Sequence, residues 1–301
     1  MKIINIILIS IVVGLLYSCG QTVKESDTNI KVKNDVDNSL IDTKKSTPQR
    51  IESEKKLTKE ERKKQIEEEE NIDSLSLDFA LKDAFKIAKK EFQNDNFIKE
   101  YEIQSYDNSF SIYIEIEISD VFKNGSKYFL LRRHVPWATY INIYKIKGEK
   151  TEELITREQG EMTYIRDTVF DVNGDKLNDF LVHWYPSSGC CRRNVYNVYL
   201  NQPDGKFTSD YRFINPTFSA SEKVIRGVGY GHPGEVGLYK YKWNGLEIDT
   251  LEFIYPDVSQ KGQFIKTIKR EYRPTDKQGK VLKEVPKEYL EIESFEWFSE
   301  Y

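Results

Sequence analysis

Apolar and polar residues alternate along one segment in the first half of the chain. From Phe110 to Ser119 every second residue is Phe or Ile, and the residues between them are Ser, Tyr or Glu. A period of two residues predicts a strand with one buried face. The Asn124-Gly125 pair behind it is a strong signal for a two-residue hairpin turn. We therefore expect an antiparallel second strand through Tyr128, Leu130 and Arg132.

Similar short runs of strand-forming residues follow at regular spacing, separated by turn markers such as Pro203-Asp204-Gly205 and Asn244-Gly245. They predict further strands over 138–146, 163–170, 179–185, 194–200, 223–229, 236–243, 246–254, 263–271 and 280–284. Many short strands at such spacing are typical of a sandwich, a barrel or a propeller-like array. We expect a mainly β fold, propeller-like or sandwich-like, of antiparallel strands.

One stretch before the strands has a helical pattern. Its apolar stripe recurs at steps of three and four residues and consists of Leu77, Leu81, Ala84, Ala88 and Phe92. Ser76 is the expected N-cap, and the helix should run to about Gln93. This single N-terminal amphipathic helix is expected to cover the first sheet.

The segment before this helix is polar. Residues 21–50 have no periodic apolar pattern, as in a flexible spacer, and residues 51–70 are rich in Glu and Lys. Glu60 and Lys64 stand four apart with the acid first, which supports a solvated helix. Apolar residues are too sparse there for a coiled-coil seam, so a charged stalk is expected.

The chain begins with Lys2 and then an apolar run from Ile3 to Leu16. The run is shorter than the roughly 20 residues that span a bilayer and suits a signal peptide. Leu16-Tyr17-Ser18-Cys19 resembles the lipobox of bacterial lipoproteins. The resemblance implies cleavage before Cys19 and acylation of Cys19, which would anchor the protein to a membrane. The alternative is an ordinary secretory signal followed by an incidental cysteine.

Aromatic residues locate the core. All of them except Tyr17 lie between Phe79 and Tyr301, and a segment without rings cannot bury enough apolar surface to offset its ordering entropy. We expect a signal peptide over 1–18, an acylated tether over 19–72, and one β-rich domain over 73–301.

Charge does not select a partner. The net charge is −4, and the doublets Arg132-Arg133 and Arg192-Arg193 are isolated. Without a dominant basic patch, and with export expected, nucleic acid is not an expected partner.

Two cysteines remain besides Cys19, and they are adjacent. Cys190 and Cys191 would meet an oxidising compartment after export. A vicinal disulfide between them and a pair of free or externally paired thiols both stay open. A zinc site is less favoured because no second Cys or His pair has ligand spacing.

Oxygen-bearing side chains recur through one loop between two strand-like segments. In Asp171-Val172-Asn173-Gly174-Asp175-Lys176-Leu177-Asn178-Asp179 they stand at positions 1, 3, 5 and 9, and position 7 offers a backbone carbonyl. This spacing can supply several hard oxygens to one Ca²⁺. The predicted ligands are Asp171, Asn173, Asp175, Leu177 through its carbonyl, and Asp179. The competing interpretation is an Asx-rich turn without metal.

The segment Val169–Val182 resembles one FG-GAP repeat, the calcium-binding blade motif of integrin-type propellers. The resemblance implies the same five ligands, with Lys176 standing where the motif usually has Gly. No second copy is present, so a complete propeller of identical blades is not expected. Residues 160–255 are also similar to a group of bacterial envelope lipoproteins with one calcium loop, some of which are immunity proteins that inhibit peptidoglycan-cleaving effectors.

Other motifs carry weaker signals. Gly229–Gly234 spells G-x-G-x-x-G but precedes a strand-like segment, which excludes a dinucleotide fingerprint; an open glycine-rich loop could instead contact a partner. Glu115 and Glu117 share one strand face, where a solvated face is a simpler explanation than paired catalytic carboxylates. His183, the histidine nearest the loop, is expected to be a packed or surface residue, and a catalytic role is the alternative.

Together these patterns predict a lipid-anchored protein of the bacterial cell envelope, in the outer membrane, with a structural Ca²⁺ site. We expect it to act as a binding module rather than an enzyme, with a protein partner in the envelope. The alternatives are an envelope hydrolase with a calcium-braced site and a structural accessory of an outer-membrane assembly.

Overall fold

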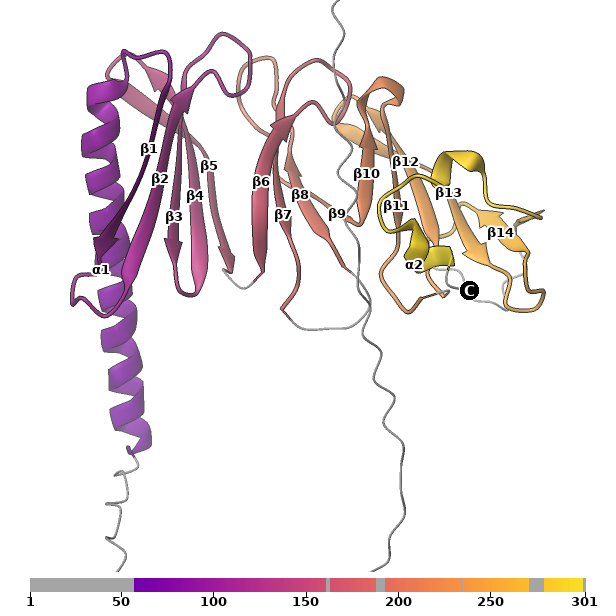
Figure 1. Cartoon of the computed structure of the whole chain (residues 1–301), viewed down its shortest axis with the longest axis horizontal. Helices are drawn as coiled ribbons and strands as arrows, with labels where there is room; N and C mark the ends of the chain where they lie inside the picture. The colour runs from indigo at the N-terminus through magenta and orange to yellow at the C-terminus, as the bar shows by residue number, and fades with distance from the viewer. Residues whose placement is uncertain (1–56, 161–162, 188–192, 234, 271–278, 300–301) are drawn as a thin grey trace, which may run out of the picture. The chain divides into compact units, whose positions relative to one another are not determined.

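The computed structural model describes residues 57–160, 163–187, 193–233, 235–270 and 279–299. All of them belong to one compact unit, Lys56–Tyr301. Its elements follow one another as one long helix, fifteen strands with a 3-10 turn among them, and a short helical segment at the C-terminal end (Figure 1).

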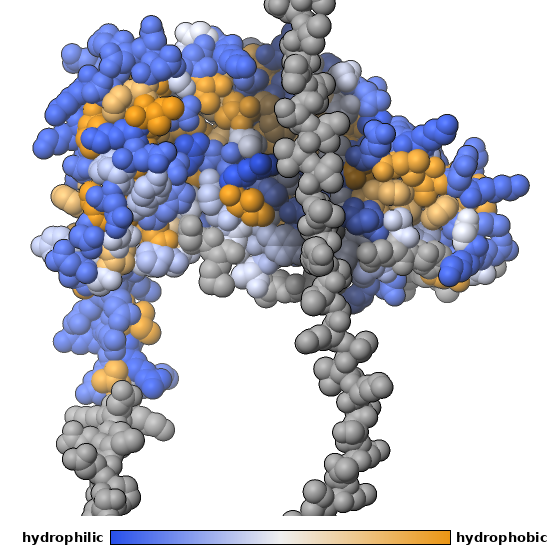
Figure 2. All heavy atoms as spheres, viewed as in Figure 1, coloured by the Kyte–Doolittle hydropathy of each residue, from blue (hydrophilic) through white to orange (hydrophobic). Residues whose placement is uncertain are grey.

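Helix α1 (Lys59–Glu91) begins at a capping box. Thr58 Oγ1 accepts the N–H of Glu61, and Glu61 Oε2 accepts the N–H of Thr58 at 2.7 Å, which satisfies two of the N–H groups that a helix start leaves open. The stretch from Lys59 to Glu70 is exposed throughout. In Figure 1 this part of α1 continues past the ends of the strands, and in Figure 2 its visible surface is mostly polar, with isolated apolar side chains.

The expected cap at Ser76 is wrong. Ser76 lies inside α1 and is fully buried. Its hydroxyl donates to the carbonyl of Ile72 at 2.7 Å and accepts the N–H of Tyr106 at 2.9 Å. Because the hydroxyl is satisfied within the helix and against the first sheet, nothing ends the helix there. The predicted charged helix and the predicted amphipathic helix are thus one element, which crosses the expected boundary at residue 72 without a break.

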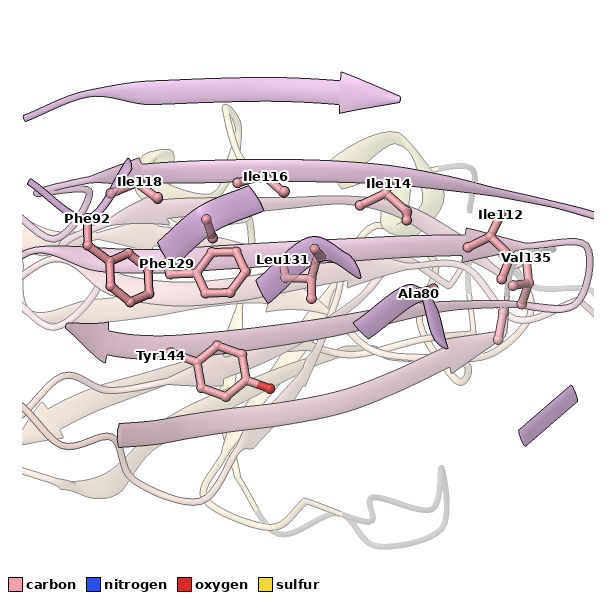
Figure 3. Packing of buried hydrophobic residues seen from close by; sticks show 13 residues of the cluster. Ala80, Phe92, Ile112, Ile114, Ile116, Ile118, Phe129, Leu131, Val135 and Tyr144 are labelled. Atoms are coloured by element: carbon pink, nitrogen blue, oxygen red, sulfur yellow. The ribbon is translucent and has the colours of Figure 1, made fainter. Parts of the chain in front are cut away.

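The first sheet has the order β1-β2-β3-β4-β5, all antiparallel. Its strands are β1 (Phe97–Gln104), β2 (Ser111–Ser119), β3 (Tyr128–Val135), β4 (Ala138–Lys147) and β5 (Lys150–Gly160). The alternation predicted in β2 is confirmed, since Ile112, Ile114, Ile116 and Ile118 are all buried. They face α1, whose alanines at 80, 84 and 88 let the helix lie close to the sheet (Figure 3).

The second sheet has the order β6-β7-β8-β9. Its strands are β6 (Tyr164–Phe170), β7 (Asp179–Trp184), β8 (Val195–Tyr199) and β9 (Tyr211–Ile214). The central strands carry consecutive buried residues, as strands do when both faces of a sheet are covered.

The third sheet has the order β10-β11-β12-β13-β14-β15. Its strands are β10 (Pro216–Ser219), β11 (Val224–Val228), β12 (Leu238–Asn244), β13 (Glu247–Pro256), β14 (Phe264–Thr267) and β15 (Lys280–Leu282), and the 3-10 turn η1 (Ala220–Glu222) joins the first two.

Four hydrophobic clusters join these elements in series. One lies between α1 and the first sheet, the next between the first and second sheets, and the third between the second and third sheets. The fourth holds the C-terminal segment, η2 (Lys287–Tyr289) and α2 (Phe295–Ser299), on the third sheet through Tyr289 and Phe298. Each sheet therefore has helical or sheet layers on both sides.

The predicted mainly β fold is confirmed, and of its two forms the sandwich-like one fits. Over the described ranges no sheet closes into a barrel and no propeller ring is formed. Every predicted strand from 110 onward has a counterpart in the structure. The strands β1, β5, β9 and β10 and the C-terminal helical segment were not predicted.

Candidate functional site

The predicted calcium loop connects β6 to β7. Phe170 pairs with Asp179 in an antiparallel ladder, so residues 171–178 close a hairpin between two strands of the second sheet. The expected order of strand, loop and strand is confirmed. Asp171 and Asp179 therefore stand at the two ends of one hairpin loop, where their carboxylates can reach its backbone.

The side chains of the loop accept hydrogen bonds from its own N–H groups. Asp171 accepts from Gly174 at 2.6 Å and from Lys176 at 2.9 Å. Asn173 Oδ1 accepts from the N–H of Asp175 at 3.1 Å, and Asp175 Oδ1 accepts from the N–H of Leu177 at 2.8 Å. These are successive Asx turns, which give the loop a defined shape.

Asp179 is the buried carboxylate of the loop, with no exposed surface. Its two oxygens accept the N–H groups of Val172 and Asn201, each at 2.9 Å. Burial raises the pKa of Asp179 to about 7, and the charges of Asp175 and Asp171 act in the same direction, while the two backbone hydrogen bonds oppose them. A buried anion in this position costs free energy unless it is protonated or meets a cation.

Two residues of the loop have left-handed backbone conformations, Gly174 and Lys176, each with φ of 75°. Lys176 thus takes the conformation that Gly adopts without strain. A Cβ on Gly174 would lie 2.2 Å from the carbonyl oxygen of Ala220. The loop therefore packs directly against η1, which joins β10 and β11 of the third sheet.

The donor chemistry of the loop fits Ca²⁺, since carboxylate, amide and carbonyl oxygens are its preferred ligands. Asp171, Asn173, Asp175, Leu177 and Asp179 all lie in the loop or at its end. The arrangement itself turns the carboxylates toward backbone N–H groups. Within the described ranges, no group of three or more Asp, Glu, His or Cys side chains is gathered closely enough to hold a metal. Calcium binding stays a prediction.

Asn201 belongs to the same region and was not predicted. It is 1% exposed, and neither polar atom of its side chain has a hydrogen-bond partner among the residues that the structure describes, which is unusual for buried groups. Asn201 follows β8 and lies opposite the end of the loop because β8 pairs with β7. Only its polarity at the end of an apolar strand could have drawn attention to it.

Glu115 and Glu117 are partly exposed and lie beside a buried ion pair. Arg132 forms a bidentate pair with Asp167 of β6, with N···O distances of 2.7 and 2.5 Å. Glu115 and Glu117 lie 3.7 and 3.9 Å from the same guanidinium. The side chains of Glu115 and Glu117 stay 32% and 30% exposed, so the expected solvated face is only partly open to solvent. The arrangement joins the first two sheets electrostatically.

His183 is half-buried in β7. Its ring stacks on Tyr196 with a centroid distance of 4.2 Å, and Nε2 lies 2.9 Å from Asn194 Oδ1. Burial lowers the pKa of His183, and the charge of Arg166 adds to this effect, while Asn194 and Glu293 oppose it. The packed position is as predicted.

An open cleft lies between the edge strand β9 and the face of β12 and β13. Its volume is about 460 Å³. The second sheet ends at β9, whereas the third sheet continues through β13, β14 and β15, so part of the third sheet's aromatic face is left uncovered. The aromatic side chains that line the cleft are Phe213, Tyr230, Tyr239, Tyr241, Phe253 and Tyr255.

Three arginines line the same cleft: Arg193, Arg212 and Arg270. Arg193 lies over the ring of Tyr230 at 4.8 Å, and Arg212 lies over the ring of Trp184 at 5.0 Å. The cleft has one acidic lining residue, Glu235. Its floor is therefore aromatic and its rim is positively charged.

The glycine-rich loop borders this cleft. Gly229 and Tyr230 are lining residues, and the N–H of Gly229 donates to the carbonyl of Gly237 at 2.8 Å. The element that follows is the strand β12 and not a helix, so the exclusion of a dinucleotide fingerprint is confirmed. Gly234 lies outside the described residues.

Three other predicted positions also lie outside the described residues: Cys19, Cys190 and Cys191. The lipid anchor and the vicinal disulfide therefore stay predictions. None of the helices in the described ranges combines the length and the apolarity needed to cross a membrane.

Comparisons with known proteins add no family. No protein-family model matches the chain, and no curated protein or solved structure matches it significantly. What the protein does is therefore inferred from its own residues and their arrangement.

Proposed function

We propose that the chain is a lipid-anchored protein of the bacterial cell envelope, in the outer membrane, and that its β-rich domain binds a protein partner. The observation that carries the binding function is the cleft beside β9. It is open to solvent, concave, and lined by aromatic and arginine side chains. Tyr and Arg are enriched among the residues that dominate binding at protein interfaces.

The exposed part of α1 supports the anchored arrangement. Its first three turns carry Lys and Glu side chains on every face, with pairs such as Lys63 and Glu67 at 3.6 Å. Because these turns contribute nothing to the core, their simplest role is to hold the domain away from its attachment point. Acylation of Cys19 would supply that attachment.

Calcium is part of the proposal. Asp171, Asn173, Asp175, the carbonyl of Leu177, and Asp179 would hold it, and the ion would neutralise three carboxylates that repel one another. Its role would be structural. The loop presses on η1 of the third sheet, so a firmer loop would stabilise the junction between the second and third sheets.

Anchoring is tested in cells with Cys19→Ala. We expect the wild-type protein to take up labelled palmitate and to sediment with membranes, and the variant to lose both properties. Palmitate labelling that persists in the variant would show that Cys19 is not the acylated residue.

Binding is tested by photocrosslinking in the same cells. Benzoylphenylalanine in place of Tyr230, which is 49% exposed and lines the cleft, should give discrete protein adducts. The same residue in place of Tyr106, which is 71% exposed and lies between β1 and β2, is the matched control. Identical adduct patterns at the two positions would contradict binding at the cleft.

A further inference from the structure

The cleft beside β9 also indicates the chemistry of what it binds. Its three arginines and single glutamate give it an excess of positive charge, although the chain as a whole carries a net charge of −4. The excess is therefore a local feature and does not follow from composition.

The arginines of the cleft have no carboxylate partner in the part of the chain that the structure describes. Elsewhere Arg132 pairs with Asp167, and Arg226 pairs with Glu222 and Glu288. Arg133 and Arg157 have uncharged partners, but their guanidinium groups donate hydrogen bonds to carbonyl, amide or hydroxyl oxygens. Arg193 and Arg212 instead contact aromatic rings. In addition, Arg193 Nε is enclosed by protein and has no hydrogen-bond partner among the described residues, a feature it shares with Nε of Arg133, Arg157 and Arg226. Such a donor is normally satisfied in a folded protein.

The aromatic floor favours a flat or apolar group beside the anion. Tyr239 and Tyr241 stack at 4.8 Å, and Phe253 and Tyr255 stack at 6.2 Å. Tyr241 and Tyr255 are only partly buried, so their rings are available to a ligand. Rings of this kind gain from contact with another ring or with a large apolar side chain.

We infer that the cleft receives an acidic segment of the partner protein, in which one or two carboxylates flank an aromatic or large apolar side chain. The carboxylates pair with Arg193, Arg212 and Arg270, and the apolar side chain lies against Tyr241 and Tyr255. A guanidinium suits this role because its planar fork binds a carboxylate through two hydrogen bonds. The inference rests on the proposed binding function and adds the chemistry of the partner.

The test uses the full chain, purified in detergent, and two short peptides followed by NMR titration. One peptide is acetyl-Gly-Asp-Phe-Glu-Gly-amide. The other has Asn and Gln in place of Asp and Glu, so that it keeps the shape and loses the charge. We expect the acidic peptide to bind at least about tenfold more tightly, as a charge-assisted hydrogen bond would give, and its affinity to fall as salt is raised.

Substitutions then locate the effect. Arg212→Gln should remove most of the difference between the two peptides, and Arg212→Lys should keep part of it, because Lys retains the charge without the fork. Arg62→Gln removes the same charge from the exposed part of α1 and should change nothing. Arg212 is exposed, so we expect unchanged melting curves; Arg270→Gln, also at an exposed residue, repeats the test if Arg212→Gln fails to fold.

Three outcomes would overturn the inference. Equal binding of the two peptides would remove the role of charge. Binding of glucuronic acid but of neither peptide would show that the cleft takes acidic sugars and not protein. Binding of neither peptide, together with adducts at position 230 in cells, would leave the binding surface in place and refute its acidic preference.

Discussion

Replacement of Gly174 by alanine tests whether the 171–179 loop presses on the third sheet. Two costs add. An alanine at φ of 75° is strained by about 1–2 kcal/mol, of which about 0.4–1 kcal/mol is offset by the less flexible unfolded chain. The new Cβ would also lie 2.2 Å from the carbonyl oxygen of Ala220, and forcing atoms into a packed site costs about 1–3 kcal/mol. We expect Gly174→Ala to lower the free energy of unfolding by about 2–4 kcal/mol.

A matched control separates the two costs. Gly125 has φ of 76°, and no atom lies within 4 Å of the position that a Cβ would take there, so Gly125→Ala has the backbone strain alone. The assay is denaturant unfolding of the full chain in chelator, followed by tryptophan fluorescence. The difference between the two variants measures the contact with Ala220. If Gly174→Ala costs no more than Gly125→Ala, the loop does not press on η1.

Three other perturbations act on the buried ion pair, on His183 and on the loop. Asp167→Ala removes the bidentate partner of the buried Arg132 guanidinium and leaves only Glu115 and Glu117, at 3.7 and 3.9 Å. It should cost about 3–5 kcal/mol of stability, whereas Arg132→Met combined with Asp167→Leu should recover most of it. Denaturant unfolding of both variants measures the two losses, and equal losses would contradict the prediction. Because the pKa of His183 is lowered below its ordinary value of 6.5, its contribution to stability is present above that pH and is lost as pH falls. The wild-type protein should therefore lose stability relative to His183→Gln as pH falls below about 6.5, which melts of both proteins across the range measure. The raised pKa of Asp179 acts in the opposite direction in both proteins and cancels in this difference. Ca²⁺ at about a hundredfold excess over its dissociation constant should add about 2.7 kcal/mol to the wild-type protein and nothing to Asp175→Ala; identical melts of the wild-type protein in calcium and in chelator, with no bound metal, would refute the site.

Sequence patterns predicted a strand correctly where turn-forming residues flank it and the strand itself carries buried apolar residues. The predicted strand at 179–185 is β7 (Asp179–Trp184), because the loop before it is rich in turn-forming residues and the strand contains the buried apolar run Phe180-Leu181-Val182. By contrast, β5 (Lys150–Gly160) is an edge strand in which only Ile155 and Gln159 are buried. Its charged sequence has no strand pattern, since an edge strand with little burial needs few apolar residues.

The helix boundary failed for a related reason. Ser76 has the properties of an N-cap, but its hydroxyl bonds to Ile72 and Tyr106 inside the fold. The competing start signal, Thr58 with Glu61, stands eighteen residues earlier. Local sequence cannot decide between two candidate N-caps when tertiary contacts provide the hydrogen-bond partners of the second candidate, Ser76, and allow it to lie inside the helix.

The candidate site was predictable only in part. The loop from Asp171 to Asp179 is contiguous, so its ends and its flanking strands follow from sequence. The cleft beside β9 combines Arg193, Arg212 and Arg270 with tyrosines of β12 and β13. The cleft exists because two sheets of unequal width lie face to face. No local sequence pattern predicts that arrangement.

The strand order has a consequence for how the protein folds. In the described ranges, strands pair only with their neighbours in sequence. The formation of each sheet therefore does not depend on a strand from a distant part of the chain. Contacts of short sequence separation favour rapid folding, and all-β proteins usually lack this advantage. Assembly can begin at the N-terminal side, and each completed sheet then offers an apolar face on which the next one condenses.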